Sequence, residues 1–523
     1  MKRANVLASS LLAWLAFTSP AGAVTWYVAP SGTASSGCVS RDAPCSLASA
    51  AAGAVAGDTV ILMDGVYKTP LNVANSGTAE AWITFKADDC STPIIEGPGV
   101  APEDGNKDTG VGSATATYLR FDGIVSRGWN TGFGNGWTGN QTPDSNGYWD
   151  IENCIGDMNG RTGFTFFSAP GVKLAHSISA HNGSSTMKSW SSGVTLYASP
   201  GGVIEANVSF ENMDAQKHTD GSGFIADRSS HGASFVNNLA FFNGGSCLRL
   251  TASSNVVFVN NTCYHDAQDT AATGPTDPDE VYFSNAPSDM STITGISFMN
   301  NALVALGTGA GLKAVNYTPP SGWASNVSAT ATVTHFAAPE GNNPDFTLAS
   351  GATALLAMGS SAAAVPTADL GFDPKCVVKK TPVMIGMMAK GAWWQYSIDY
   401  DYIKSIGGVA RCFNPKPRSG MPDIGSYANG AVTTAAQNTC VPPTTGGGGS
   451  AGGMTQGGSS SAGAASVAGS SATGGSMSSA PSTEANAGCS CRAAGHSTRD
   501  AAGAACGLLA FALIGSRRRR ARR

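Results

Sequence analysis

Short runs of alternating apolar and polar residues recur between residues 153 and 301, and they follow two patterns. In the first pattern an Asn stands directly before a short, mostly apolar run. Its clearest members begin at Asn207, Asn238, Asn261 and Asn301. In the second pattern four residues alternate, as in the run from Gly223 to Ala226. Both patterns return after roughly 23 to 31 residues, and a fixed period of this size is typical of solenoid proteins.

Runs this short with a period of two residues predict β-strands and not helices. Each coil has one face to bury, and it can bury that face only against the next coil. The sequence therefore predicts an all-β, right-handed parallel β-helix in which Gly193, Gly223 and Cys247 lie in one column. The recurring Asn suits a tight turn, because Asn tolerates left-handed backbone and bonds its own chain. We expect stacked Asn side chains to pair from coil to coil in a structural role.

The β-helix is expected to span residues 24–305, with a different element at each end. The Ala-rich stretch from Ser46 to Val55 predicts a short helix that plugs the first coil. The repeats fade in residues 306–441, which we expect to form an irregular cap, because a solenoid end must be covered. The aromatic residues Trp394 and Tyr396 are interpreted mainly as packing within this cap, with a sugar platform as the alternative.

Residues 1–23 have the features of a secretory signal peptide. Lys2 and Arg3 precede an apolar stretch too short to span a membrane, and Ala21-Gly22-Ala23 fits the small-residue cleavage rule. The protein is therefore expected to be exported.

The C-terminal end predicts attachment to the cell surface. Residues 442–487 are rich in Gly and Ser, and we expect them to form a flexible linker. Residues 488–523 contain Cys489 and Cys491, an apolar run and a terminal block of arginines. This order resembles the MYXO-CTERM sorting tag, which implies a sorting protease and final attachment at the cell surface or outer membrane. A plain C-terminal membrane anchor is the alternative.

The chain has 12 Cys, and export permits disulfides. Cys38 and Cys45 are close in sequence and flanked by Gly and Pro, so we expect them to pair. One pair is also expected among the Cys residues of the C-terminal region, which are Cys376, Cys412 and Cys440. The Cys residues within the repeats are interpreted as buried small apolar residues, and these are Cys154, Cys247 and Cys263.

Composition narrows the function classes. The balance of 31 Lys and Arg against 35 Asp and Glu gives no sign of a nucleic-acid partner. The segments Trp26 to Gly32, Gly57 to Leu62 and Ile83 to Ala87 resemble the opening of secreted pectate-lyase-like parallel β-helix proteins. That resemblance implies the fold and a carbohydrate-related function. It leaves the chemistry open, because the fold hosts lyases, hydrolases, epimerases and non-catalytic surface proteins.

The densest polar cluster runs from Asp214 to Arg228. Stacking should place Lys188 near Lys217 or His218, and Arg249 beside Ile225. Several charged side chains would then share one exposed groove. A groove of this kind suits β-elimination of an acidic polysaccharide, in which a cation neutralises the uronate carboxylate and a base removes the neighbouring proton. The candidate bases or carboxylate clamps are Lys217, Arg228 and Arg249, with His218 as a base or hydrogen-bond donor and Lys188 as a substrate contact. The candidate calcium ligands are Asp214, Asp220 and Asp227.

The run from Asp220 to Ala226 also resembles a phrase of family nine polysaccharide lyases, which implies that Asp220 is a metal ligand. Where that family continues with an Asp-rich calcium phrase, this chain has Gly244 to Arg249. Trp129 and Trp137 are interpreted equally as sugar-stacking groups or as cover for the solenoid.

Three functions stay open at this stage. A polysaccharide lyase comes first. A non-catalytic surface protein that binds glycans or serves as an adhesin comes second. The third is a glycoside hydrolase, for which Asp220 and Asp227 would be the carboxylate pair.

Overall fold

A computed structural model of the chain describes the residues below, all within one compact unit, Met1–Gly446. They are residues 22–99, 108–136, 146–187, 190–269, 271, 279–285, 292–305, 311–315, 317–318, 326–330, 335–361, 365–380 and 394–428.

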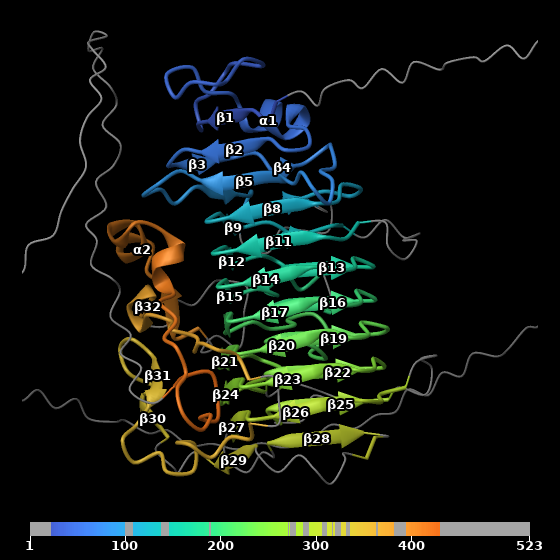
Figure 1. Ribbon diagram of the computed structural model, residues 1–523, viewed down its shortest axis with the longest axis vertical. Helices are drawn as coiled ribbons and strands as arrows, with labels where there is room; N and C mark the ends of the chain where they lie inside the picture. The colour runs from blue at the N-terminus through green and yellow to red at the C-terminus, as the bar shows by residue number, and fades with distance from the viewer. Residues whose placement is uncertain are drawn as a thin grey trace, which may run out of the picture. The chain divides into compact units, whose positions relative to one another are not determined.

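Three long parallel sheets run along the unit, and each coil from β2 to β28 contributes one strand to each sheet (Figure 1). Sheet A contains β1 (Thr25–Val28), β2 (Thr59–Leu62), β5 (Ile83–Ala87), β8 (Leu119–Asp122), β11 (Trp149–Glu152), β14 (Lys173–Ala175), β17 (Val203–Glu205), β20 (Ser234–Val236), β23 (Val257–Val259) and β26 (Ser297–Met299). Sheet B contains β3 (Val66–Tyr67), β6 (Ile94–Glu96), β9 (Val125–Arg127), β12 (Ile155–Asp157), β15 (Ile178–Ala180), β18 (Val208–Phe210), β21 (Leu239–Phe241), β24 (Thr262–Tyr264), β27 (Ala302–Ala305) and β29 (Val327–Thr330). Sheet C contains β4 (Leu71–Asn72), β7 (Thr109–Gly112), β10 (Thr131–Gly134), β13 (Thr162–Phe167), β16 (Val194–Tyr197), β19 (Phe224–Asp227), β22 (Leu248–Thr251), β25 (Val281–Ser284) and β28 (Leu312–Val315).

This arrangement is an all-β parallel β-helix, as the repeats predicted. Strands β28 and β29 pair with β25 and β27, so the parallel sheets continue beyond residue 305. The predicted column is also present: Val194 N donates to Gly223 O and Phe224 N donates to Cys247 O.

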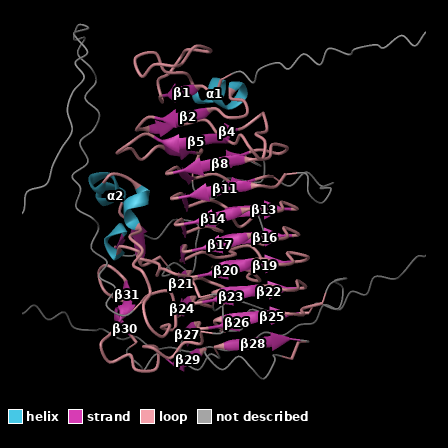
Figure 2. Ribbon diagram, in the orientation of Figure 1, coloured by secondary structure: helices cyan, strands magenta, loops and turns pink. Residues whose placement is uncertain are grey.

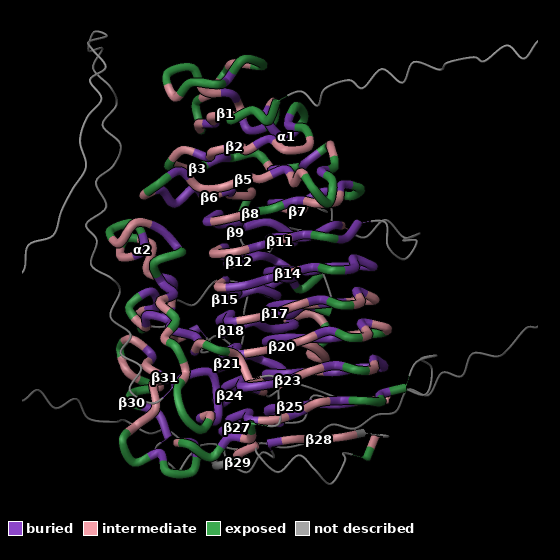
Figure 3. Tube along the Cα trace, viewed as in Figure 1, coloured by how far each residue is buried: buried purple, intermediate pink, exposed green. Residues whose placement is uncertain are grey.

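The core consists of inward-facing side chains stacked in columns. In sheet C, Phe164, Val194, Phe224 and Leu248 lie in register on successive strands, and each is fully or almost fully buried. The rings of Phe164 and Phe133 are stacked with centroids 4.8 Å apart. Burial of one such side chain stabilises the fold by about 1.5–3 kcal/mol, so regular stacking accounts for the buried interior (Figure 3).

Two ladders of amide side chains line the turns, as expected for the recurring Asn. In each ladder an Asn side-chain oxygen accepts from the backbone N–H and the side-chain amide of the preceding member. The first ladder joins Asn207, Asn238, Asn261, Asn301 and Asn326. The second joins Asn159, Asn182, Asn212 and Asn243 and ends at Asp266. The left-handed backbone lies one residue before the first ladder, as at Ala206 (φ 54°), and not at the ladder Asn itself.

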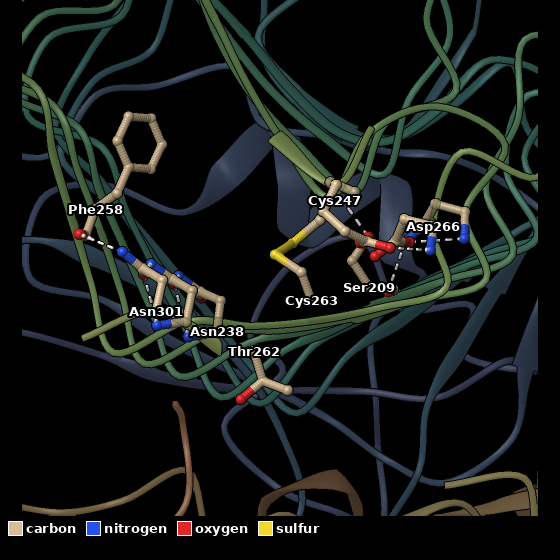
Figure 4. The surroundings of a disulfide bond; sticks show 12 residues. Ser209, Asn238, Cys247, Phe258, Thr262, Cys263, Asp266 and Asn301 are labelled. Atoms are coloured by element: carbon tan, nitrogen blue, oxygen red, sulfur yellow. Dashed lines mark hydrogen bonds between the residues drawn. A yellow bond between two sulfur atoms is a disulfide. The ribbon is translucent and has the colours of Figure 1, made fainter. Parts of the chain in front are cut away.

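The expectation that Cys247 and Cys263 are unpaired is wrong, because they form a disulfide between sheets B and C (Figure 4). In the coils above, this corner holds Gly193 against Ser209, and a Cβ on Gly193 would lie 2.3 Å from the Ser209 hydroxyl. Small residues are needed where the two strands approach so closely. Two Cys residues meet the same requirement by bonding to each other. Cys154 is buried and free, as expected.

The N-terminal end matches the prediction. Helix α1 (Leu47–Gly53) begins after Ser46, whose side chain accepts from Ser49 N, and it buries Leu47 and Ala50. Cys38 and Cys45 form the predicted disulfide. In the C-terminal region the pair is Cys376 with Cys412.

The C-terminal segment covers the side of sheet B, whereas a cap over the end of the solenoid was expected (Figures 1 and 2). It contains β30 (Phe336–Ala338), β31 (Asp345–Leu348), the 3₁₀ turn η1 (Pro374–Cys376), β32 (Val377–Lys379), β33 (Tyr396–Ile398), α2 (Tyr400–Ile406) and the 3₁₀ turn η2 (Val409–Cys412). Phe346 packs on Phe241 of sheet B with ring centroids 4.9 Å apart. Trp394 and Tyr396 are buried, which confirms their packing role.

Several predicted features lie outside the described residues. These are almost all of the signal peptide, the linker, the tag with Cys489 and Cys491, and the side chains of Trp137 and Lys188. Within the described ranges, no helix has the length and apolarity needed to cross a membrane.

Candidate functional site

A cavity of about 490 Å³ lies on the outer face of sheet C. Its floor is a column of outward-facing residues, Thr165, Thr195 and Ile225, on β13, β16 and β19. Its remaining lining residues are Arg161, Phe167, Met187, Trp190, Tyr197, Asp220, Asp227 and Arg228. We call this cavity the sheet C groove.

The loops that border the groove come from two longer coils. Between the second Asn ladder and the strands of sheet C, the described residues 183–187 and 190–192 of one coil and residues 213–222 of the next belong to long loops, while the coils on either side have only 160–161 and 244–247 there. The two loops are bonded to each other, because Gly221 N donates to Ser191 O at 2.6 Å. Side chains on these loops therefore reach the edge of the sheet C floor.

Asp220 and Arg249 form an ion pair beside the groove, with Arg249 Nη1 2.5 Å from Asp220 Oδ1. The same nitrogen donates to Thr219 O at 2.8 Å. Burial opposes the charge on Arg249, but Asp220 and Asp227 outweigh it and raise its pKa. Arg249 is therefore held as a cation that anchors the 213–222 loop. The sequence placed it correctly beside Ile225, which is its partner in the register, but its pairing disagrees with a role as base.

Asp214 is buried inside the loop and serves the loop backbone. Its Oδ2 atom accepts from Thr219 N, Thr219 Oγ1 and Asp220 N at 3.2–3.3 Å. Burial, followed by the nearby charge of Asp220, raises the pKa of Asp214. Its role in the structure is to shape the loop.

Arg161 is the main groove residue that sequence reasoning missed. It lies on the turn before β13, lines the groove, and its Nε atom is buried without a hydrogen-bond partner. Burial lowers the pKa of Arg161, although Asp220 and Asp214 oppose the shift. Its guanidinium lies 5.6 Å from the centre of the Phe167 ring. An incompletely satisfied, largely buried cation at one side of a groove is suited to meet an anionic group.

Lys217 and His218 do not belong to the set of residues that lines the groove. Lys217 is exposed. His218 Nδ1 lies 2.7 Å from Asp269 Oδ2 on the following coil. The polar cluster of the sequence is thus divided: Asp220 and Asp227 face the groove, while His218 faces Asp269.

The aromatic residues are also distributed differently from the expectation. Trp129 is 3 % exposed, and its Nε1 donates to Ile95 O at 3.0 Å. Its ring is therefore part of the core, and the sugar-stacking interpretation of Trp129 is wrong. Trp190, which the sequence analysis did not single out, lines the groove and is 63 % exposed.

Arg228 and Tyr197 close the opposite side of the groove. Arg228 follows Asp227 at the end of β19 and is exposed, with its guanidinium 6.0 Å from the centre of the Tyr197 ring. Asp227 lies in the outward column with Tyr197, as alternation predicted. The groove therefore carries positive charge on both sides, from Arg161 and Arg228.

The predicted calcium site does not fit this geometry. Asp220 is engaged by Arg249, and Asp214 points into its own loop. In the part of the chain that the structure describes, no group of three or more His, Cys, Asp or Glu side chains is arranged to hold a metal ion.

A second cavity, of about 280 Å³, lies between sheet B and the C-terminal segment. At its base the buried His181 ring bridges Asp157 (2.7 Å) and Glu211 (3.2 Å). Burial alone would lower the pKa of His181, but the two carboxylates raise it to about 10. Glu211 also accepts from Gln395 N at 2.6 Å, and Tyr400 donates to Asp157 at 2.8 Å. This charged cluster attaches the C-terminal segment to the solenoid.

The chain is thus a parallel β-helix protein with a charged, aromatic-lined groove on one sheet. Its fold is similar to the crystal structure of pectate lyase Pel9A, with a TM-score of 0.41, 15 % identity, and coverage of 66 % of this chain and 94 % of that chain. It is also similar to a rhamnogalacturonan lyase (TM-score 0.38, 14 % identity, 61 % and 91 % coverage). A third similar structure is the alginate lyase from Paenibacillus sp. str. FPU-7 (TM-score 0.34, 14 % identity, 52 % and 99 % coverage). No protein-family model and no curated protein sequence matches the chain.

Proposed function

We propose that the sheet C groove binds a uronate-containing polysaccharide and that the protein cleaves it by β-elimination. The observation that carries this proposal is Arg161, a largely buried guanidinium whose Nε has no partner, at one side of a groove of about 490 Å³. A buried polar group without a partner costs free energy, and a carboxylate offers the strongest compensation for a guanidinium.

The two arginines that line the groove have different roles in the proposed reaction. Arg228, exposed at the edge, pairs with the substrate carboxylate and makes the neighbouring C–H more acidic. Arg161 attracts the polymer as a cation, and its neutral form, which burial favours by lowering the pKa of Arg161, takes that proton; the pKa of Arg249 is raised, so Arg249 stays protonated. The electron pair of the C–H bond forms the new C=C bond, the bond to the leaving glycosidic oxygen breaks, and that oxygen gains a proton from solvent.

The groove geometry favours the lyase over the glycoside hydrolase. A hydrolase needs one carboxyl group that is protonated and one that is free to act on the sugar or on water. Asp220 is held by Arg249 and cannot serve as either without breaking an ion pair of 2.5 Å. No step of the proposed reaction requires Asp220 or a metal ion.

Glycan binding without catalysis is the second candidate, and the aromatic lining supports it equally. Phe167, Tyr197 and Trp190 supply apolar surface that a sugar could cover whether or not a bond is broken.

One experiment separates the two functions. The purified protein is incubated with pectate, alginate and other uronate polymers, with and without calcium, and the ultraviolet absorbance of the unsaturated product is followed. A lyase gives an ultraviolet absorbance that rises with time on at least one polymer, both with and without calcium. Retention of a polymer on an affinity gel without any such signal supports the binding protein instead.

Export and surface attachment through the C-terminal tag form part of the same proposal, and they rest on the sequence pattern around Cys489 and Cys491. Cell fractionation tests them: the full chain belongs in the surface or outer-membrane fraction, and the C489A/C491A variant does not reach it. A wild-type chain that stays in the cytoplasm contradicts this part.

A further inference from the structure

The most exposed aromatic side chain described in this structure stands beside the groove. Trp190 is 63 % exposed, and Met187, 54 % exposed, lies on the same loop and lines the same cavity. Large apolar side chains that stay in water next to a cavity mark a surface that is covered by a ligand. Isolated exposed apolar residues need no explanation, but these two share one loop and one cavity.

The backbone at Trp190 is also strained, with φ of 59° in the left-handed region. Positive φ recurs at the tight turns of this solenoid, as at His181 and Ala198, but Trp190 lies within an extended loop. Tyr118, Tyr148 and Phe242 share this conformation elsewhere in the solenoid, so the combination of a positive φ with the exposure and the groove position of the side chain distinguishes Trp190. Glycine would satisfy the backbone without strain. The side chain of Trp190 is 63 % exposed, so its burial within the protein offsets little of the free energy that this backbone conformation costs.

We propose that Trp190 is a stacking platform for one pyranose ring and that it selects saccharides with an uninterrupted C–H face. The inference deepens the proposed function and rests on it for the assumption that the ligand is a saccharide. An indole ring attracts polarised C–H groups over its face, and Met187 extends the apolar surface beside it.

The solenoid fixes where this ring lies relative to the charged groups. Ser191 and Gly221 are hydrogen-bonded neighbours, so Trp190 and Asp220 hold equivalent positions on adjacent coils. Arg161 comes from the coil on the other side, since β13, β16 and β19 are consecutive strands of sheet C. Neighbouring strands are about 4.8 Å apart. The ligand is therefore an oligosaccharide whose stacked residue sits on the middle coil and whose uronate residue lies one coil away, at Arg161.

Fluorescence and kinetics test this assignment with three variants. Trisaccharides of galacturonate, mannuronate and β-1,4-glucose serve as probes in titrations that follow tryptophan fluorescence. Wild-type protein shows saturable quenching with at least one acidic probe, and the W190F variant loses that quenching while it retains binding by calorimetry. W190A weakens the affinity, or raises KM, by about tenfold. Y148A removes another exposed aromatic residue, directly before β11 of sheet A and outside the groove lining, and leaves the affinity unchanged.

The W190G variant separates ligand binding from a structural role. Glycine relieves the strained φ, so its thermal midpoint equals or exceeds that of W190A, while its affinity is as weak as that of W190A. A structural tryptophan would give a large loss of stability instead. Unchanged affinity and KM in W190A, or the absence of saturable quenching with all three probes, overturns the inference. Quenching and binding without an unsaturated product leave the stacking site standing and overturn only the lyase step.

Discussion

Arg249 holds Asp220 by an ion pair of 2.5 Å and holds the neighbouring Thr219 carbonyl with the same nitrogen. Both side chains are mostly buried, with 16 % and 13 % of their surface exposed. The pair therefore joins β22 to the loop that borders the groove on the preceding coil. Arg249, on one coil, therefore supports the groove loop of the preceding coil.

Replacing Arg249 with Met should lower the free energy of unfolding by about 3 kcal/mol, because Asp220 is left as an uncompensated, mostly buried charge. The D220N/R249M double variant should lose less than the sum of the single variants, as urea unfolding in a double-mutant cycle would show. The half-exposed pair Lys173–Glu152 is the control, and K173M should cost less than about 1 kcal/mol. Additive losses at Asp220 and Arg249 would argue against the pair.

Arg161 should be the groove residue on which turnover depends most. R161A should lower kcat/KM on the cleaved polymer by about 100-fold or more, since it removes the proposed base. R161K keeps the positive charge but changes the geometry, and it should retain binding better than turnover. R120A, at an exposed arginine paired with Asp150 on sheet A, is the control and should match wild type. Equal rates for R161A and R120A would remove Arg161 from the mechanism.

The disulfide between Cys247 and Cys263 should stabilise the solenoid by about 3 kcal/mol, the value expected for a closed loop of this size. The C247G/C263A variant restores the residues that the preceding coil has in this corner, Gly223 and Ala240. It should therefore fold and lose only the contribution of the crosslink. Chemical unfolding with and without a reductant measures the difference: the reductant should lower the midpoint of wild type more than that of the variant, which keeps only the Cys38–Cys45 and Cys376–Cys412 disulfides among those described. Equal shifts of the two midpoints would contradict the assignment.

Because of His181, the free energy of unfolding should fall as the pH rises into the alkaline range. Its folded-state pKa is raised from 6.5 to about 10, so its protonated form stabilises the fold fully below pH 6.5. That contribution is lost as pH rises from 6.5 through about 10. The stability advantage of wild type over H181Q should shrink across this window, at a slope of at most about 1.4 kcal/mol per pH unit.

His176 provides the matched control with the opposite sign. Burial lowers its pKa below 6.5, so its protonation favours the unfolded chain. Relative to H176Q, wild type should lose stability as pH falls through 6.5. Parallel urea titrations of the two variants between pH 5 and pH 10 distinguish the cases, and identical pH profiles would exclude both assignments.

The repeats made the coils predictable, because period-two alternation, coil length and the Asn positions all depend on local sequence. The stacking of Ile225 on Arg249 followed from that period alone. The same column logic, applied two coils before Ile225, would have found Arg161, which precedes Phe164 by the same interval that separates Ser191 from Val194. Arg161 was not among the predicted site residues, because it lies outside the dense polar run from Asp214 to Arg228.

The remaining errors arose where long-range packing decides. The exposure of Trp129 and of Trp190 depends on which loop lies over sheet C. The composition of a loop does not show where that loop lies. The partner of Cys247 depends on how closely sheets B and C approach at one corner. The C-terminal segment carries no repeat, so its place along sheet B followed from contacts such as Phe346 on Phe241.

The second Asn ladder also has a direction. Each amide accepts from the coil before it and donates onward, but Asp266, at the last position, accepts from Asn243 and has no amide to donate. A duplicated coil could therefore be spliced in ahead of residue 266 with every turn amide still satisfied. The same insertion placed after it would require Asn at that position first, so the protein can be lengthened by repetition from one side of this carboxylate only.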